Sequence, residues 1–361
     1  MTKRTVGVMT MYRDNYGAFL QAYALQKTLN SLEYDAELIH YDNRREKTIL
    51  GIPLADCKKT RYFIKRLLVE VVMHKKHMRR SEIFRESIEK NLIVSKKEYH
   101  SNAALESDPP QYDIYLSGSD QVFNPNLEPQ SFEARMLSFT NGYKVSYAAS
   151  AGNIDGIGDK KEPLLDRLRS FQKISVREEE TRKYLEQHLG SAVSRNIDPT
   201  LLLGAHEWRQ FGKKPEYLKG KYIFYYRVLV QPELHDIAEA ISKELGIPVF
   251  AADGNAKFSN QVQRQEFLSP EEWVGALADA EYVVTNSFHG VAFSINLKRK
   301  VRVVLPPSNT TRIRDMIQKS GLERLYEDRI LQDDELKPLY GASEDFLLAE
   351  RTRALSYLEN L

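Results

Sequence analysis

Residues 281–305 read EYVVTNSFHGVAFSINLKRKVRVVL, and apolar runs of two kinds alternate in this stretch. The run at 281–285 is short and rich in β-branched residues, which is typical of a buried strand, whereas residues 290–297 have the spacing of a helix. A second short apolar run at 301–305 completes the series. A strand, a helix and a strand in this order predict a βαβ unit, whose strands lie parallel in one sheet.

The same alternation extends outward over most of the chain. We predict further strands at 5–11, 36–41, 112–116, 143–148, 173–176, 222–228, 247–251 and 263–267, with a helix at 18–32. Ser269, Pro270 and Glu272 predict another helix, which runs to about Ala280, because they suit its N-cap, N1 and N3 positions. The expected fold class is α/β, with two Rossmann-like domains that face one cleft. Ligands of such folds bind beyond the carboxyl ends of the strands.

The alternating pattern loosens at 206–220, HEWRQFGKKPEYLKG, and we place a domain junction between Gly204 and Gly220. We therefore expect an N-terminal domain at 1–204, a C-terminal domain at 220–340 and an amphipathic helix at 344–361. A chain of 361 residues is long for one core, since domains average about 150 residues.

Composition excludes several classes of protein. A formal net charge of +2 indicates no general affinity for nucleic acid, and the single cysteine, Cys57, excludes a disulfide framework and a Cys-rich zinc site. The histidines lack HExxH-like spacing, so we expect no metal centre. Arg13 and Asp14 come too early for a secretory signal, and no apolar run reaches the ~18 residues of a membrane span. These features predict a cytoplasmic protein.

His289 follows the strand at 281–285 and lies in the first turn of the next helix, with Asn286 or Ser287 as the candidate N-cap. Backbone N–H groups and the helix dipole make such a position an anion site. The dipole disfavours a charged imidazole, so His289 should be neutral until an anion binds, and it could then act as a base or, once protonated, as an acid. Alternatively, loop carbonyls satisfy its ring nitrogens. Position alone leaves both possibilities open.

Two polar segments end predicted strands of the N-terminal domain. Asn15, Tyr16 and Gly17 precede the helix at 18–32, and Gly17 would let a ligand approach the backbone. A second group, suited to sugar hydroxyls, follows the strand at 112–116 and consists of Ser119, Asp120, Gln121 and Asn124. Either segment could instead serve only to shape a turn. Neither is a GxGxxG, so a dinucleotide fingerprint is absent.

Arg177 ends the strand at 173–176, where it could reach into the cleft and bind a carboxylate or phosphate through two hydrogen bonds. It could equally pair with the acidic residues at 178–180. Asp198 could orient a base or cap a helix. The segment 58–80 carries nine Lys or Arg against one Glu, beside an apolar helical stripe. Such a helix can contact an anionic membrane or a polyanionic substrate, or pack on its own domain with its charges in water.

Six segments, taken in order, resemble the polysaccharide pyruvyl transferase family: NYGAFLQAYAL, YDIYLSGSDQVFNP, VSYAASAG, ISVREEET, IDPTLLL and VVTNSFHGVAFSINL. The resemblance covers about residues 6–306. It implies a two-domain, glycosyltransferase-B-like fold. It also implies transfer of the enolpyruvyl part of phosphoenolpyruvate onto two hydroxyls of one sugar, which forms a cyclic pyruvate ketal and releases phosphate. The donor is then a substrate, and no cofactor is expected.

The resemblance also implies roles for residues. His289 and Arg177 become the catalytic candidates, and Arg177 matches the arginine implicated on the facing domain. The expected donor contacts are Asn286, Ser287, Gly290 and Arg227, and the expected acceptor contacts are Asn15, Tyr16, Gly17, Ser119, Asp120, Gln121 and Asn124. Some relatives place an Arg two residues before the motif histidine, where this chain has Ser287. Either another cation contacts the donor, with Arg227, Lys298 and Arg299 as candidates, or the donor is not phosphoenolpyruvate.

Two other functions fit the same architecture. A nucleotide-sugar glycosyltransferase would place its diphosphate on the helix that begins near His289. A non-catalytic sugar-binding protein would keep the cleft and bind its ligand without releasing phosphate. For a pyruvyl transferase, the basic segment 58–80 suggests a lipid-linked oligosaccharide as the acceptor, at the inner face of a membrane.

Overall fold

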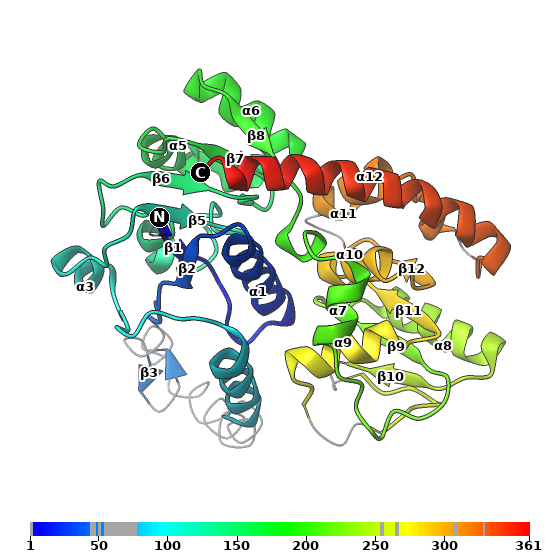
Figure 1. Cartoon of the computed structure of the whole chain (residues 1–361). Helices are drawn as coiled ribbons and strands as arrows, with labels where there is room; N and C mark the ends of the chain where they lie inside the picture. Colours follow the sequence, from blue (N-terminus) through cyan, green and yellow to red (C-terminus); the bar gives the residue numbers. More distant parts are fainter. Residues whose placement is uncertain are drawn as a thin grey trace. The chain divides into compact units, whose positions relative to one another are not determined.

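The computed structural model describes residues 3–43, 48–49, 52–53, 78–252, 256–263, 267–306, 310–327 and 329–361. The chain forms two compact units (Figure 1). The first unit comprises Met1–Ser175, Tyr184–Ser194 and Leu361, and the second comprises Val176–Lys183 and Arg195–Asn360.

The first unit is built on a parallel sheet in the order β2 (Asp35–Leu38), β1 (Thr5–Met9), β5 (Ile114–Ser117) and β6 (Lys144–Ser146). In this register Val8 lies between Leu38 and Leu116, so the centre of the sheet is aliphatic. Helix α1 (Tyr16–Ser31) follows β1 and is buried along most of its length. Alanines on several sides of α1 allow this close packing, because they add little bulk.

Shorter elements complete the first unit. They are β3 (Thr48–Ile49), β4 (Ile52–Pro53), a helix through 78–91, α3 (Asn102–Ser107), η3 (Pro129–Ser131), α4 (Phe132–Arg135), η4 (Asp155–Lys160) and α5 (Lys161–Leu168). The predicted basic helix at 58–80 lies outside the described residues except at 78–80.

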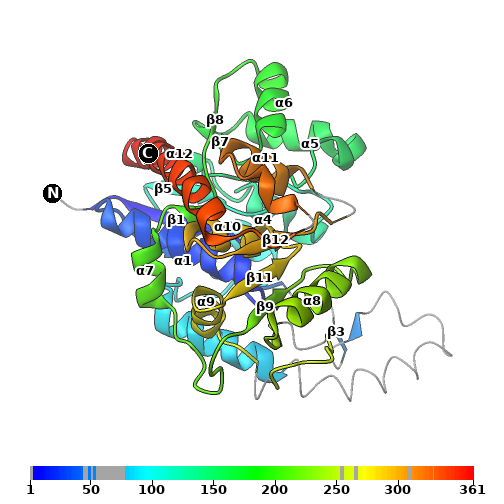
Figure 2. The same ribbon diagram turned by 90° about the vertical axis from the view of Figure 1, so that its right-hand side faces the viewer.

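The second unit has its own parallel sheet, in the order β10 (Val249–Ala251), β9 (Ile223–Tyr226), β11 (Tyr282–Thr285) and β12 (Val301–Val303). Alternate residues of β9 face opposite layers, as the pleat of a strand requires. Phe224 and Tyr226 pack on Trp273 of α9 (Pro270–Ala278), whereas Tyr225 packs with Leu234 of α8 (Pro232–Leu245). The two helices therefore cover opposite faces of the sheet (Figure 2).

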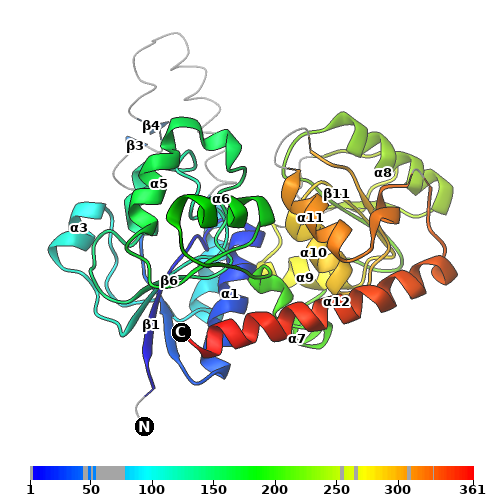
Figure 3. The ribbon, with the colours of Figure 1, turned by 90° about the horizontal axis from the view of Figure 1, so that it is seen from above.

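Further helices of the second unit follow β9 to β12 in the chain. They are α10 (Phe288–Asn296), α11 (Thr311–Lys319), η6 (Glu323–Tyr326) and α12 (Asp333–Glu359). Helix α12 is long and runs beside α10 and α11 (Figure 3). Its Arg351 donates to Leu201 O at 2.6 Å and to Asn296 Oδ1 at 2.9 Å. These bonds attach α12 to the end of α10 and to the residues just after Asp198.

The boundary between the units lies earlier than the junction placed at 204–220. It passes through β7 (Ile174–Val176), α6 (Glu179–Leu189) and β8 (Val193–Arg195), which form one crossover with β7 paired to β8. The residues at 205–211 form α7, whose Trp208 is fully buried and lies 4.7 Å from the Phe293 ring. Because α7 buries little beyond this one side chain, its apolar pattern is too sparse to distinguish it from a linker.

The remaining predicted elements agree with the structure apart from two. Residues 263 and 267 lie in no strand, and 264–266 are outside the described residues. The last helix starts eleven residues before the predicted position 344, at Asp333, with Glu335 accepting from the Gln332 backbone N–H. Pro338 lies inside it as the sixth residue, and because proline has no N–H, the Asp334 carbonyl receives no hydrogen bond from that position. The predicted cap of α9 is confirmed, since Ser269 and Glu272 form a reciprocal capping box.

Candidate functional site

His289 lies in the first turn of α10, as the sequence predicts. Ser287 rather than Asn286 is the N-cap, and its Oγ accepts from the Gly290 N–H at 3.4 Å. Thr285 Oγ1, one step earlier, accepts from the Ser287 N–H at 3.0 Å. At Gly290 a Cβ would lie 2.4 Å from Thr285 Oγ1, so this tight turn requires glycine. His289 remains 12% exposed and can therefore meet a ligand.

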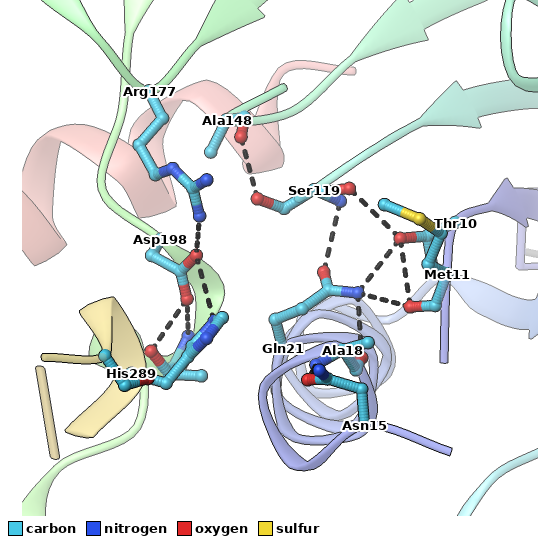
Figure 4. Close-up of polar contacts among 12 residues, drawn as sticks. Thr10, Met11, Asn15, Ala18, Gln21, Ser119, Ala148, Arg177, Asp198 and His289 are labelled. Atoms are coloured by element: carbon cyan, nitrogen blue, oxygen red, sulfur yellow. Dashed lines mark hydrogen bonds and ion pairs between the residues drawn. The ribbon is translucent and has the colours of Figure 1, made fainter. Parts of the chain in front are cut away.

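Asp198 connects His289 to Arg177 (Figure 4). Its Oδ1 caps η5 (Pro199–Leu201), accepting from the Thr200 N–H at 3.0 Å and the Thr200 hydroxyl at 2.7 Å. Its Oδ2 accepts from Arg177 and lies 3.8 Å from His289 Nε2. The capping role considered for Asp198 is therefore present, and its other oxygen lies within ion-pair distance of His289, so the role of orienting a base stays a prediction.

The charges around Asp198 are almost fully buried. Arg177 Nε donates to Glu178 Oε1 at 3.2 Å, and these side chains are 5% and 3% exposed. Burial alone would raise the pKa of Asp198, but Arg177, His289 and the Thr200 hydrogen bonds outweigh it and hold that pKa below its ordinary value. One guanidinium thus faces two carboxylates, and a proton on His289 would balance the group.

Arg177 lies in the second unit with His289, and not on a facing N-terminal domain as expected. The reason is the position of the boundary, which falls between Ser175 and Val176 inside β7. Arg177 also lies over the ring of Phe288, with its guanidinium carbon 4.6 Å from the ring centre. The strand that precedes Arg177 was predicted correctly, but Arg177 was assigned to the wrong unit.

Asn286 does not occupy the donor-binding position expected for it. Its Oδ1 accepts from the Val228 N–H at 3.0 Å, and its Nδ2 donates to Leu229 O at 3.0 Å and Gln231 Oε1 at 3.1 Å. The side chain is buried and holds the loop that follows β9. An amide with both ends engaged in this way positions a loop rather than a ligand.

Two of the other cations proposed for the donor lie at the opposite end of α10 from His289. Lys298 and Arg299 follow the opposite end of α10, where Lys298 pairs with Glu344 at 2.5 Å and Arg299 donates to Ala280 O at 3.5 Å. Arg227 lies over Tyr225, with its guanidinium 6.0 Å from that ring, on the face of the sheet that α8 covers. Lys298 and Arg299 are therefore poorly placed to contact a ligand at His289, because sequence proximity does not reveal the direction of a side chain, whereas Arg227 stays a predicted donor contact.

The predicted acceptor-binding residues of the first unit fall into two groups. Asn15 caps α1, Tyr16 packs on Phe84 at 5.3 Å, and Gly17 is buried. Ser119 is also buried and donates to Ala148 O at 2.7 Å, so these four have structural roles, although Asn15 stays exposed and its contact with an acceptor stays a prediction. The second group, which stays partly exposed near the carboxyl end of β5, contains Asp120, Gln121 and Asn124.

Gln21 is the residue of this region that the sequence analysis missed. It is fully buried, donates to Thr10 Oγ1 at 2.9 Å and Met11 O at 2.8 Å, and accepts from the Ser119 N–H at 3.2 Å (Figure 4). The sequence contains a signal for a buried polar residue here, since a glutamine stands among apolar residues in AFLQAYAL. The apolar spacing of this helix does not show whether a glutamine within it faces the core or the solvent.

Within the described part of the chain, no cluster of three or more His, Cys, Asp or Glu side chains is arranged to hold a metal ion. In the same residues, no helix is both long enough and apolar enough to cross a membrane.

The sequence matches a family model described as polysaccharide pyruvyl transferase over residues 15–308. The match covers well over half of the chain, which therefore belongs to this family. No curated protein matches the sequence.

Solved structures share the fold at low sequence identity. A UDP-N-acetylglucosamine 2-epimerase is similar with a TM-score of 0.54 and 13% identity, over 96% of this chain and 95% of that one. A putative UDP-N-acetylglucosamine 2-epimerase from Listeria monocytogenes has a TM-score of 0.51 and 11% identity, over 98% and 91%. These similarities confirm the glycosyltransferase-B-like α/β fold.

Proposed function

We propose that the chain, as a member of the polysaccharide pyruvyl transferase family, moves the enolpyruvyl group of phosphoenolpyruvate onto two hydroxyls of a saccharide and forms a pyruvate ketal. The observation that carries the proposal is the Asp198 carboxylate, which binds Arg177 and lies 3.8 Å from His289 Nε2. A buried carboxylate beside an imidazole stabilises its protonated form. Protonation of the methylene carbon of the donor requires such an acid.

The reaction proceeds through one addition and one displacement at the same carbon. His289 protonates the methylene carbon, C2 becomes oxocarbenium-like, and the first hydroxyl adds to C2 while its proton returns to His289. The second hydroxyl then displaces phosphate, and its proton leaves with the phosphate. Two C–O bonds to the sugar and one C–H bond form, and the C2–O bond to phosphate breaks. General acid catalysis of this kind typically contributes ~10²–10⁴ in rate.

The N-terminus of α10 supplies the electrostatic part of the mechanism. Backbone N–H groups of the first turn and the positive end of the dipole attract the anionic donor. Arg177 acts through Asp198, because its hydrogen bonds to Asp198 and Glu178 fix the carboxylate that faces His289. In this mechanism His289 is the catalytic residue, and Arg177 is a positioning residue for the acid.

The experiment that tests the proposal is phosphate release from phosphoenolpyruvate, with and without a panel of hexosyl acceptors. Wild type should release phosphate only when an acceptor is present, and His289→Asn should abolish that release. Mass spectrometry of the product should show the added pyruvate ketal. Full activity in His289→Asn would remove this residue from the mechanism, and the absence of ketal product with every acceptor would overturn the function.

A nucleotide-sugar glycosyltransferase is the alternative, favoured by the anion site at the start of α10 in a glycosyltransferase-B-like fold. This alternative requires tight binding of a nucleoside diphosphate, which a thermal-shift measurement would detect. A non-catalytic sugar-binding protein would bind the acceptor and release no phosphate. The same two assays therefore separate all three functions.

The acceptor is expected to be a saccharide or lipid-linked oligosaccharide of a bacterial-type surface polysaccharide. Asn15, which is exposed, and Asp120, Gln121 and Asn124, which are partly exposed, are the accessible acceptor candidates. The basic segment 58–80 would hold a cytoplasmic enzyme at the inner face of a membrane through anionic lipids. Flotation with vesicles that contain or lack anionic lipid tests this, and equal flotation with both would remove the membrane contact.

A further inference from the structure

Asp198 lies in the middle of a short segment that α12 contacts at both ends. This segment, which we call the Asp198 segment, begins at Arg195 and ends at Leu201. Glu350 of α12 accepts from Arg195 at 2.7 Å, three residues before the carboxylate. The next residue of α12, Arg351, donates from Nε to Leu201 O at 2.6 Å, three residues after it. Two neighbouring side chains of one helix therefore hold the segment on either side of Asp198.

Helix α10 is attached to the same part of the chain through its last residue. Asn296 donates from Nδ2 to Thr200 O at 3.3 Å and to Leu203 O at 2.8 Å. Thr200 is also the residue whose N–H and hydroxyl bind Asp198. Because His289 lies in the first turn of α10, the helix that carries the imidazole is tied to the segment that carries the carboxylate.

Arg351 connects these two attachments. Besides its bond to Leu201 O, its Nη2 donates to Asn296 Oδ1 at 2.9 Å, so one guanidinium contacts both the Asp198 segment and α10. Arg351 is half-buried, and no carboxylate of the described chain lies within ion-pair distance of it. Its donors bind neutral oxygens at fixed positions, where the rigid fork of a guanidinium defines geometry better than an ammonium group does.

The need to cover apolar surface does not explain these polar contacts. Leu347, Ala354 and Leu358 are buried and supply the apolar face of α12. Glu350 is only 4% exposed, and replacing a buried ion pair by apolar residues is often neutral or stabilising. The contacts of α12 are therefore better explained by the place that they give to the Asp198 segment. The helix also lies beyond residue 308, where the match to the family ends.

We infer that Arg351 is a positioning residue of the candidate active site, which holds Asp198 in place beside His289. The inference rests on the proposed function, because it concerns the acid named there. Arg351 acts through Leu201 and Asn296 and does not contact the donor. A misplacement of about 1 Å by a remote change can cost about 10²-fold in rate, so a distant contact of this kind matters for transfer.

The first test compares acceptor-dependent phosphate release by Arg351→Ala and wild type. We expect kcat to fall about 10- to 100-fold, whereas KM for phosphoenolpyruvate should change little because the start of α10 keeps its own cap. Arg351→Lys should lose less, since it keeps the charge and can still reach one of the two oxygens. Arg353→Ala is the matched control, because it removes an arginine of the same helix whose partner is Glu350, and it should keep the kcat of wild type.

A double-mutant cycle separates positioning from general stability. If Arg351 acts through Asp198, Arg351→Ala should reduce transfer by less than about threefold in an Asp198→Asn background, because the group that it positions is already lost. Thermal melting of each variant verifies that the assays are done below unfolding. Equal fold losses in the two backgrounds would overturn the inference, and so would a kcat of Arg351→Ala equal to that of wild type.

A second readout does not depend on transfer. The nitrogen NMR signals of the His289 ring, assigned by their absence in His289→Asn, report its protonated fraction at a pH where wild type is half protonated. That fraction should fall in Arg351→Ala, as in Asp198→Asn, because a displaced carboxylate stabilises the protonated ring less. An unchanged fraction would overturn the inference. A lowered fraction in a protein that forms no ketal with any acceptor would overturn the proposed function and leave the positioning of Asp198 by Arg351 standing.

Discussion

The two polar clusters of the molecule have similar settings and different chemistry. In the first unit Gln21, Thr10 and Ser119 meet beyond β1 and β5, and every group in the network is neutral. In the second unit Arg177, Asp198 and His289 meet near the end of β11 and the start of η5, and each of them can carry charge. A neutral network fixes the shape of a loop at any pH, whereas a charged one can also hold and release a proton.

His289→Asn breaks the charged cluster most severely. Asparagine keeps a polar side chain in the first turn of α10 but cannot carry a proton, so we expect transfer to fall by about 10²–10⁴-fold. The free energy of unfolding should change little, because His289 is partly exposed. Phosphate release and thermal melting measure the two quantities, and a large loss of stability would mean that the residue has a structural role instead.

Asp198→Asn separates the charge of the cluster from its shape. The amide can still cap η5, but Arg177 loses one of its two carboxylates, and breaking such a buried pair costs about 3–5 kcal/mol of stability. Transfer should fall as well, since His289 loses the group that favours its protonated form.

The same variant has a defined pH signature. The folded-state pKa of Asp198 is lowered, so its contribution to stability is complete above its ordinary value of 3.8 and disappears as pH falls through the lower folded value. Wild type should therefore lose stability more steeply than Asp198→Asn below about pH 4. Parallel denaturation curves for the two proteins would contradict the assignment of Asp198 as the ionised centre.

Gln21→Leu is the corresponding change in the neutral cluster. It leaves the Thr10 hydroxyl, Met11 carbonyl and Ser119 N–H without their buried partner, which should cost about 1–3 kcal/mol. No titratable group is involved, so the loss measured by urea denaturation should be the same at pH 5 and pH 8. A loss that changes with pH would show that the two clusters differ less than proposed.

Ser287→Ala is expected to have the smallest effect. The variant removes the Oγ that accepts from the Gly290 N–H, and the loss of an N-cap costs about 0.5–2 kcal/mol. The backbone at the start of α10 should stay in place through Thr285, which accepts from the Ser287 N–H. Transfer activity should therefore fall far less than in His289→Asn, and phosphate release by both variants makes the comparison.

Local rules of sequence were sufficient for part of this site. The strand before His289, the helix after it and the anion-binding position between them follow from residues within one βαβ unit. The cap of α9 follows from Ser269 and Glu272 for the same reason, because each partner lies within one helical turn. The class of fold was accessible too, since it depends on the order of strands and helices.

Contacts between distant residues were beyond the reach of these rules. Arg177 and Asp198 are separated from His289 by about a quarter or more of the chain, and nothing in their spacing indicates that one carboxylate serves both partners. Asn286 shows the opposite difficulty, which is proximity in sequence without a shared side-chain direction. It stands beside the catalytic candidate in sequence, yet its side chain turns to the loop after β9.

The crossover made by β7, α6 and β8 has a consequence for recombination between related genes. Arg177 lies before α6, Asp198 after β8 and His289 far downstream, although all three belong to the second unit. A single exchange in the segment 204–220 would join Arg177 and Asp198 of one parent to His289 of the other. The three residues would then be inherited from different parents, so chimaeras should be joined upstream of β7.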